Sequence, residues 1–291
     1  MKVNSPTVAR LYVLAGAVLW STGGVFIKEI DADALSITFF RCVFAALWVA
    51  PFACGRPFPR PLDAAVSIVL FTGLLGLYVG ATKETTAANA IFLQYTAPVY
   101  VIVLAPILVR EHLRRPDLLA LGVCLIGIAV LFFGNQGDTD SAGLWMGVGS
   151  GLFYGLFLLW LRRTRYADPI AVTFVNCAGV AVVLAPFPSV WDVGAQEVGM
   201  LAAMGLVQFA LPYVLFTTGL RLVSGAEASL IALAEPALNP IWVAIFVGEK
   251  PTAATIAGGA IILAGLALRY GVLVGDGDSP GREADQVARP T

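Results

Sequence analysis

The chain has 291 residues, of which 58% are hydrophobic and only 13% charged, with a mean hydropathy of +0.84 and a net charge of −1. A soluble domain carries about 25% charged residues, so this composition excludes an ordinary water-soluble protein. The apolar runs are long and do not alternate, which predicts an all-α polytopic membrane protein whose surroundings are a lipid bilayer. No nucleic-acid partner is expected.

A window of about 19 residues predicts ten transmembrane helices joined by short connections. The first follows Lys2 and Arg10 and resembles a signal peptide, but no small-residue cleavage site follows it, and further spans come after it. The polar tail, residues 275–291, is expected to be disordered. The expected spans are residues 11–29, 36–54, 64–82, 87–109, 117–134, 143–162, 169–188, 197–217, 225–247 and 253–274.

The distribution of positive charge predicts the orientation of these spans. Fourteen of the 18 Lys and Arg residues fall on segments that share one side with the N-terminus. Cytoplasmic segments carry an excess of Lys and Arg, so both termini, including the tail, are expected in the cytoplasm.

The two halves of the chain resemble each other. The segment "DALSITFFRCVFAALWVAPF" (33–52) matches "DPIAVTFVNCAGVAVVLAPF" (168–187), and further along Pro98 matches Pro236 and Glu111 matches Glu249. Each repeat holds five spans, an odd number, so the second copy enters the membrane from the opposite side. The sequence therefore predicts an inverted five-plus-five repeat of residues 1–137 and 138–274, an architecture of secondary transporters.

Polar and aromatic residues within the spans are the candidate binding residues. Polar groups at membrane depth usually face the bundle interior, and rings with a polar edge suit amphipathic solutes. Glu235 is the strongest candidate, because its carboxyl group could exchange protons or bind an amine. Interior hydrogen bonding, or for the rings a lipid-interface position, is the alternative. The expected substrate-binding residues are Trp20, Tyr78, Gln94, Tyr95, Tyr154, Gln208, Tyr213, Glu235 and Asn239.

Four further residues are expected to serve gating or structure: Arg41, Pro98, Asn176 and Pro236. Proline removes a backbone hydrogen bond and can kink its helix, although static shaping of the bundle is the alternative for both prolines. Arg41 lies a few residues inside the expected outer face. Its side chain could reach the interface or pair with a nearby carboxylate, which predicts an outer-gate or helix-locking role rather than substrate contact. The four candidate carboxylates are Glu29, Asp31, Asp33 and Glu84.

Enzymes and channels are the alternative classes. The four cysteines are scattered singly, and the only histidine, His112, falls in an expected cytoplasmic connection. An intramembrane enzyme would need a nucleophile beside a base, or a cluster of metal ligands, so neither catalysis nor a cofactor is expected. A channel would need a filter loop, which the sequence does not show. Because an inverted repeat supplies its own pseudo-symmetric centre, a monomer is sufficient.

Short motifs in a set order resemble the drug/metabolite transporter (DMT) superfamily, EamA type. They are "VLWST", "ITFFRC", "FLQYTAPVYV" and "LAEPALNPIWV", in the first, second, fourth and ninth expected spans. Within the superfamily the chain is most similar to the YddG branch of aromatic amino-acid exporters. The resemblance implies a bacterial inner-membrane transporter that exports amino acids and related small metabolites by alternating access around a central cavity. A drug or nucleotide-sugar carrier of the same superfamily is the alternative.

Overall fold

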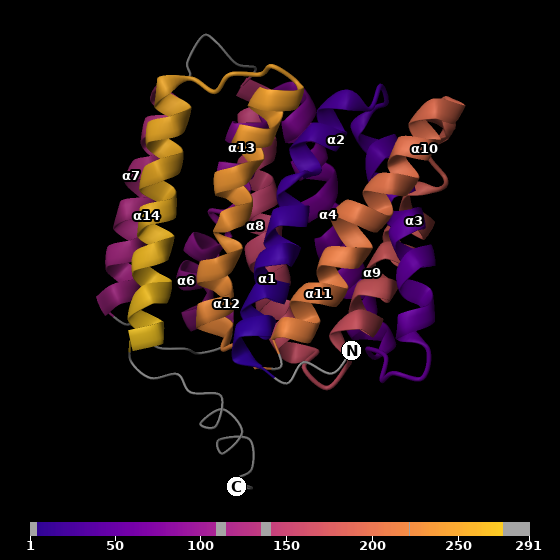
Figure 1. The fold of residues 1–291 in the computed structure, drawn as a ribbon, viewed down its shortest axis with the longest axis horizontal. Coiled ribbons are helices and arrows are strands. Elements are labelled where there is room, and N and C mark those ends of the chain that lie inside the picture. Colours follow the sequence, from indigo (N-terminus) through magenta and orange to yellow (C-terminus); the bar gives the residue numbers. More distant parts are fainter. Residues whose placement is uncertain (1–4, 109–114, 135–140, 221, 276–291) are drawn as a thin grey trace, which may run out of the picture.

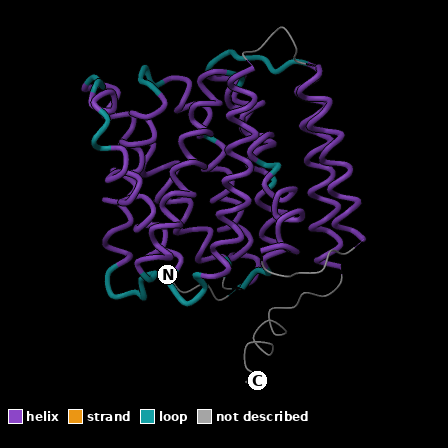
Figure 2. The backbone as a smooth tube through the Cα atoms, turned by 180° about the vertical axis from the view of Figure 1, so that it is seen from behind, coloured by secondary structure: helices purple, strands orange, loops and turns teal. Residues whose placement is uncertain are grey.

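The computed structural model describes residues 5–108, 115–134, 141–220 and 222–275, so Glu111, His112 and nearly all of the expected tail lie outside it. The described residues are helical and contain no strand. The helices run side by side as a bundle, and α1 begins at the same end of the bundle at which α14 finishes (Figure 1). Viewed from behind, teal loops are confined largely to the two ends (Figure 2).

The described chain contains α-helices labelled α1 to α14 and two shorter irregular helices. A 3₁₀-helix, η1 (Pro188–Trp191), follows α9, and a π-helical turn, η2 (Gly205–Ala210), joins α10 to α11. The α-helices are α1 (Pro6–Ser21), α2 (Gly23–Glu29), α3 (Ala34–Ala53), α4 (Pro61–Glu84), α5 (Ala87–Gln94), α6 (Ala97–Leu108), α7 (Arg115–Gly134), α8 (Ser141–Arg163), α9 (Pro169–Leu184), α10 (Ala195–Met204), α11 (Leu211–Gly219), α12 (Gly225–Ala232), α13 (Ala234–Phe246) and α14 (Ala253–Gly275).

Eight helical stretches in the described residues are long and apolar enough to cross a membrane. The expected spans 117–134 and 169–188 fall on apolar helices of only 10–17 residues, Leu118–Gly134 and Pro169–Leu184. Large apolar side chains such as Ile107, Phe133 and Val182 are 73% exposed on the bundle surface. A lipid bilayer explains both the long apolar helices and the exposed apolar side chains, and the chain is a multi-pass integral membrane protein.

Three of the expected spans are interrupted within the bundle. The first breaks at Thr22, the fourth between Gln94 and Ala97, and the ninth at Leu233. Pro98 follows the break in the fourth span, and Pro236 follows the break in the ninth. Neither proline has an N–H group that could donate to the carbonyl oxygen four residues earlier. Such breaks are tolerated at membrane depth only where other groups satisfy the freed backbone.

Small residues let two long helices pack closely. The helices α7 and α14 lie side by side (Figure 1), and Gly127 faces Gly258 at their contact. A Cβ atom on Gly127 would lie 2.8 Å from the carbonyl oxygen of Gly258, and one on Gly258 would lie 2.7 Å from that of Gly127. Real Cβ atoms do not approach backbone so closely, so glycine is required at both positions for this spacing.

The contact predicts that Gly127→Val destabilises the protein by about 1–3 kcal/mol, the usual cost of overpacking. Gly122→Val on the same helix is the matched control, because a Cβ atom at Gly122 meets nothing within 4 Å. Thermal unfolding of both variants in detergent measures the difference. Equal melting temperatures would show that α7 and α14 can separate without cost.

Candidate functional site

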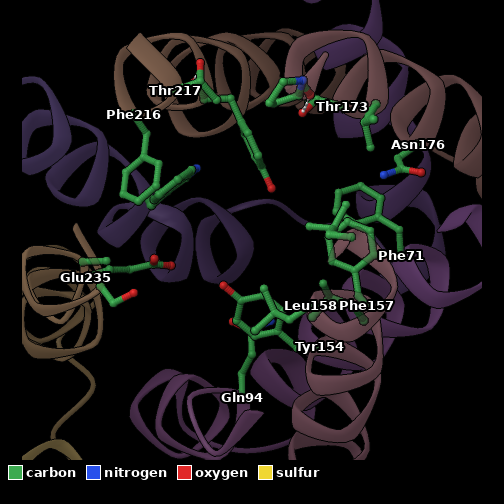
Figure 3. A pocket seen from close by; sticks show the side chains of 18 of the residues that line it. Phe71, Gln94, Tyr154, Phe157, Leu158, Thr173, Asn176, Phe216, Thr217 and Glu235 are labelled. Carbon is green, nitrogen blue, oxygen red and sulfur yellow. Dashed lines mark hydrogen bonds between the residues drawn. The ribbon is translucent and has the colours of Figure 1, made fainter. Parts of the chain in front are cut away.

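A cavity of about 560 Å³ lies inside the bundle and is lined by residues of both halves of the chain. Pockets for small organic ligands measure about 300–1,000 Å³, so this one can hold a metabolite-sized solute. Side chains from several helices converge on the space, with Gln94 and Tyr154 on one side and Thr217 across from them (Figure 3).

Most of the residues expected from the sequence lie in the cavity lining. Eight of the nine substrate-binding candidates line it, and so do Arg41, Pro98 and Asn176 of the gating set. Asn239 and Pro236 lie outside the lining, at the broken ninth span. The eight are Trp20, Tyr78, Gln94, Tyr95, Tyr154, Gln208, Tyr213 and Glu235.

Aromatic rings form a continuous part of the lining. The ring of Trp20 meets those of Tyr213 and Phe216 at centroid distances of 5.1 and 4.9 Å, and Phe209 lies 5.0 Å from Tyr213. Edge-to-face and tilted contacts of this kind favour fixed ring positions. This part of the cavity therefore offers a rigid apolar surface to a solute.

Tyr95 connects the broken fourth and ninth spans. Its hydroxyl group donates to Oε2 of Glu235 at 2.7 Å and lies 3.3 Å from the carbonyl oxygen of Ala232. That carbonyl lies four residues before Pro236, which has no N–H to satisfy it. The Tyr95 hydroxyl therefore holds the Glu235 carboxyl group at the cavity surface, and its oxygen lies beside the break in the ninth span.

Two residues expected to bind substrate instead donate hydrogen bonds to backbone carbonyl groups at the break in the first span. Asn239 Nδ2 donates to the carbonyl oxygen of Ser21 at 3.0 Å, and Gln208 Nε2 donates to that of Trp20 at 3.4 Å. Asn239 is fully buried and takes no part in the lining. Although it shares a helical face with Glu235, the close approach of α1 confines it to this backbone contact.

Arg41 does not form the ion pair expected from the sequence. Its side chain is 2% exposed and lines the cavity, and its Nε and Nη1 atoms have no hydrogen-bond partner. The guanidinium carbon lies 5.3 Å from the centroid of the Phe209 ring. Of the expected acidic partners, Asp33 lies at the start of α3 and accepts from the Ser36 amide at 2.5 Å. Arg41 is two turns further along and faces inward.

Several lining residues gave no usable signal in the sequence. Phe71, Phe157 and Phe209 lie in segments that are apolar on all sides, so no periodic pattern marks their cavity face. Thr173 was detectable in principle, because it lies one helical turn before Asn176 and hence on the same face. Figure 3 shows Thr173 and Asn176 on the same side of the cavity.

Comparison with known proteins identifies the family. Residues 7–133 and 141–271 each match the model of the EamA-like transporter family. The chain belongs to this family. An uncharacterized transporter of Archaeoglobus fulgidus is 34% identical over 261 residues, covering 89% of this chain and 94% of the relative. Human solute carrier family 35 member G1 is 25% identical, covering 90% and 79% of the two chains.

The fold also has a solved counterpart. A crystal structure matches this EamA family member with a TM-score of 0.64 at 20% identity, covering 92% of this chain and 99% of that one. At this identity the likeness concerns the fold alone. The family and its relatives show that the chain is a transporter of the EamA family, and its cargo must be argued from the cavity.

The contact between Tyr95 and Glu235 predicts a measurable coupling. In a double-mutant cycle of Tyr95→Phe and Glu235→Ala, we expect a coupling of about 0.5–1.5 kcal/mol, the range of hydrogen bonds between transmembrane helices. Unfolding of the four proteins in detergent measures it. Tyr100→Phe is the control, because its hydroxyl contacts Val148 O at 3.3 Å and not Glu235. Additive effects of Tyr95→Phe and Glu235→Ala would contradict a direct interaction.

Proposed function

We propose that this EamA family transporter exports amino acids and related small metabolites, aromatic ones included, across the bacterial inner membrane by alternating access. The observation that carries this proposal is the central cavity, which combines aromatic rings with one buried cation and one carboxyl group. An amino acid presents the matching groups: an apolar side chain, a carboxylate and an amine.

An inverted repeat is part of the proposal, with units 1–137 and 138–274. On α7, a Cβ atom at Gly127 would lie 2.8 Å from Ile262 of α14. On α14, a Cβ atom at Gly265 would lie 2.9 Å from Cys124 of α7. The two contacts are related by the repeat, because Gly127 corresponds to Gly265 and Cys124 to Ile262 at an offset of 138 residues. The pairing of α7 with α14 therefore has the two-fold character that an inverted repeat requires.

The extent of the cavity lining supports an inward-facing state. The lining reaches the turn between α8 and α9 at Thr164, Arg165 and Ala167, and Arg165 is exposed. This turn belongs to the positively charged segments that the positive-inside rule assigns to the cytoplasm. A solute would therefore enter from the cytoplasm in this state.

The opposite end of the bundle is closed by a polar cluster that we call the outer clamp, comprising Lys28, Thr85, Ala87 and Glu249. Lys28 Nζ lies 2.8 Å from Glu249 Oε2 and donates to the Thr85 carbonyl oxygen at 2.8 Å. Glu249 Oε1 accepts from the Ala87 amide, also at 2.8 Å. The clamp joins the two proposed repeats, so its opening would accompany the change to an outward-facing state.

The outer clamp predicts how Glu249→Gln changes access to the cavity. Loss of the ion pair should raise labelling from the periplasmic side about fivefold, the population change that about 1 kcal/mol produces. The reporter is Leu75→Cys, a lining position, in a chain without its four native cysteines. Glu227→Gln is the matched control, because it removes the Arg10–Glu227 pair, which is separate from the clamp. Equal labelling in both variants would contradict the gate.

Transport itself is tested by counterflow in proteoliposomes. Vesicles loaded with unlabelled L-phenylalanine should accumulate labelled L-phenylalanine with saturable kinetics, because a carrier exchanges solute through one site. Empty vesicles are the control. Accumulation of a cationic drug or a nucleotide sugar, without any counterflow of amino acids, would contradict the proposed cargo and favour another carrier of the family.

A further inference from the structure

Three side chains of the cavity lining contain buried polar atoms without a hydrogen-bond partner. The atoms are Nε and Nη1 of Arg41, Oδ1 of Asn176 and Oε1 of Gln208. The residues are 2%, 1% and 6% exposed. Buried polar groups nearly always have partners, so the two unpartnered nitrogens of Arg41 indicate that a hydrogen-bond acceptor comes from within the cavity that this residue lines.

These three residues, which we call the polar wall, come from neighbouring elements. Arg41 on α3 and Asn176 on α9 occupy matching positions of the two halves, and the two helices pack together. Gln208 lies on η2, which also packs on α3; a Cβ atom at Gly205 of η2 would lie 3.2 Å from the Arg41 carbonyl oxygen. The amide nitrogen of Asn176 is on the cavity side of its side chain (Figure 3). Arg41 and Asn176 therefore present N–H donors to the cavity, whereas the Nε2 atom of Gln208 already donates to the Trp20 carbonyl oxygen.

The charges of the lining leave Arg41 without a counter-ion. Among the described residues, the charged members of the lining are Arg41, Arg165 and Glu235. Arg165 is exposed at the cavity entrance, where water can solvate it. Glu235 is close enough to interact electrostatically with Arg41 but forms no ion pair with it. A buried cation without a paired anion is strongly unfavourable, and an anionic group of a bound solute would supply the compensating charge.

We infer that Arg41 is the binding site for the carboxylate of the transported solute, with the amide nitrogen of Asn176 beside it as a further donor. A guanidinium group presents parallel N–H donors that match the two oxygens of a carboxylate. The inference rests on the proposed function, because it takes this cavity to be the place where cargo binds.

The opposite side of the cavity fits the other groups of an amino acid. Glu235 and Asn176 lie on opposite sides of the open space, with the rings of Phe71, Phe157 and Tyr154 along its edge (Figure 3). A solute whose carboxylate contacts Arg41 would direct its amine toward Glu235. Its apolar side chain would pack against the rings, so the cavity has a defined polarity for a zwitterion.

A helix-locking role would give Arg41 different surroundings. An arginine that locks helices together donates to carbonyl or carboxylate groups of those helices, whereas Nε and Nη1 of Arg41 have no partner. Its one described aromatic contact is with the Phe209 ring, and it leaves Nε and Nη1 without a hydrogen-bond partner. This geometry favours direct contact with the solute.

The experiment compares pairs of probes with and without a carboxylate, using the purified full-length protein. L-phenylalanine and L-phenylalaninamide are tested by ligand-induced shifts in melting temperature and by counterflow. Arg41→Gln should weaken L-phenylalanine binding at least about tenfold and L-phenylalaninamide binding by less than about twofold. Arg41→Lys should give an intermediate loss, because it keeps the charge but not the paired donors.

Arg60→Gln is the matched control. Arg60 also lies over an aromatic ring, 5.2 Å from the centroid of Tyr166, but is not part of the cavity lining. It should leave the affinities for both probes unchanged. If Arg41→Gln weakens both probes equally, Arg41 acts through structure and the inference is wrong.

A second probe pair separates this inference from the proposed cargo. If the wild-type protein neither binds nor exchanges L-phenylalanine, the amino-acid proposal fails, and 3-phenylpropionate is compared with 3-phenylpropionamide. Binding of 3-phenylpropionate that Arg41→Gln abolishes would still support the carboxylate site. Wild-type protein that shows no preference for the carboxylate member of either pair would overturn it.

Discussion

The structure depends on one constraint: a backbone carbonyl freed inside the membrane must find another donor. At the break in the first span, side chains from elements of the other half meet this need. Gln208 and Asn239 donate to carbonyl groups there, and Tyr95 links the breaks in the fourth and ninth spans through its hydrogen bond to Glu235. The breaks consequently join helices of the two halves around the cavity, and a residue that satisfies a break also helps to shape the site.

Some charged groups inside the bundle are paired, and one is not. In the outer clamp, Lys28 and Glu249 are paired with each other and with backbone groups, so closing that end of the bundle is favourable. At the polar wall, Arg41 is buried without a counter-ion. Paired charges stabilise the conformation in which they are paired, whereas the stability of a conformation with an unpaired buried charge depends on what binds to that charge. Groups that are locally unfavourable in this way are typical of functional sites.

The two halves match where they shape the bundle, and several of the positions that face the cavity differ between them. The breaks near Tyr95 and at Leu233 occupy matching positions, as do Pro98 and Pro236. The side chains at such positions diverge, since Tyr95 corresponds to Leu233. This pattern is consistent with shared mechanics and a binding site that has its own polarity.

The sequence by itself determined the membrane class, the approximate spans and eleven of the residues that line the cavity, because hydropathy, proline and polar residues at membrane depth act locally. Only the tertiary structure decided where the Arg41 and Asn239 side chains point. Arg41 faces the cavity instead of the acidic residues before α3, and Asn239 is confined to the backbone of α1. In helices that are apolar on all sides, no periodic pattern indicates which face is inward. That face is set by packing against helices from the other half of the chain, which lie far away in sequence.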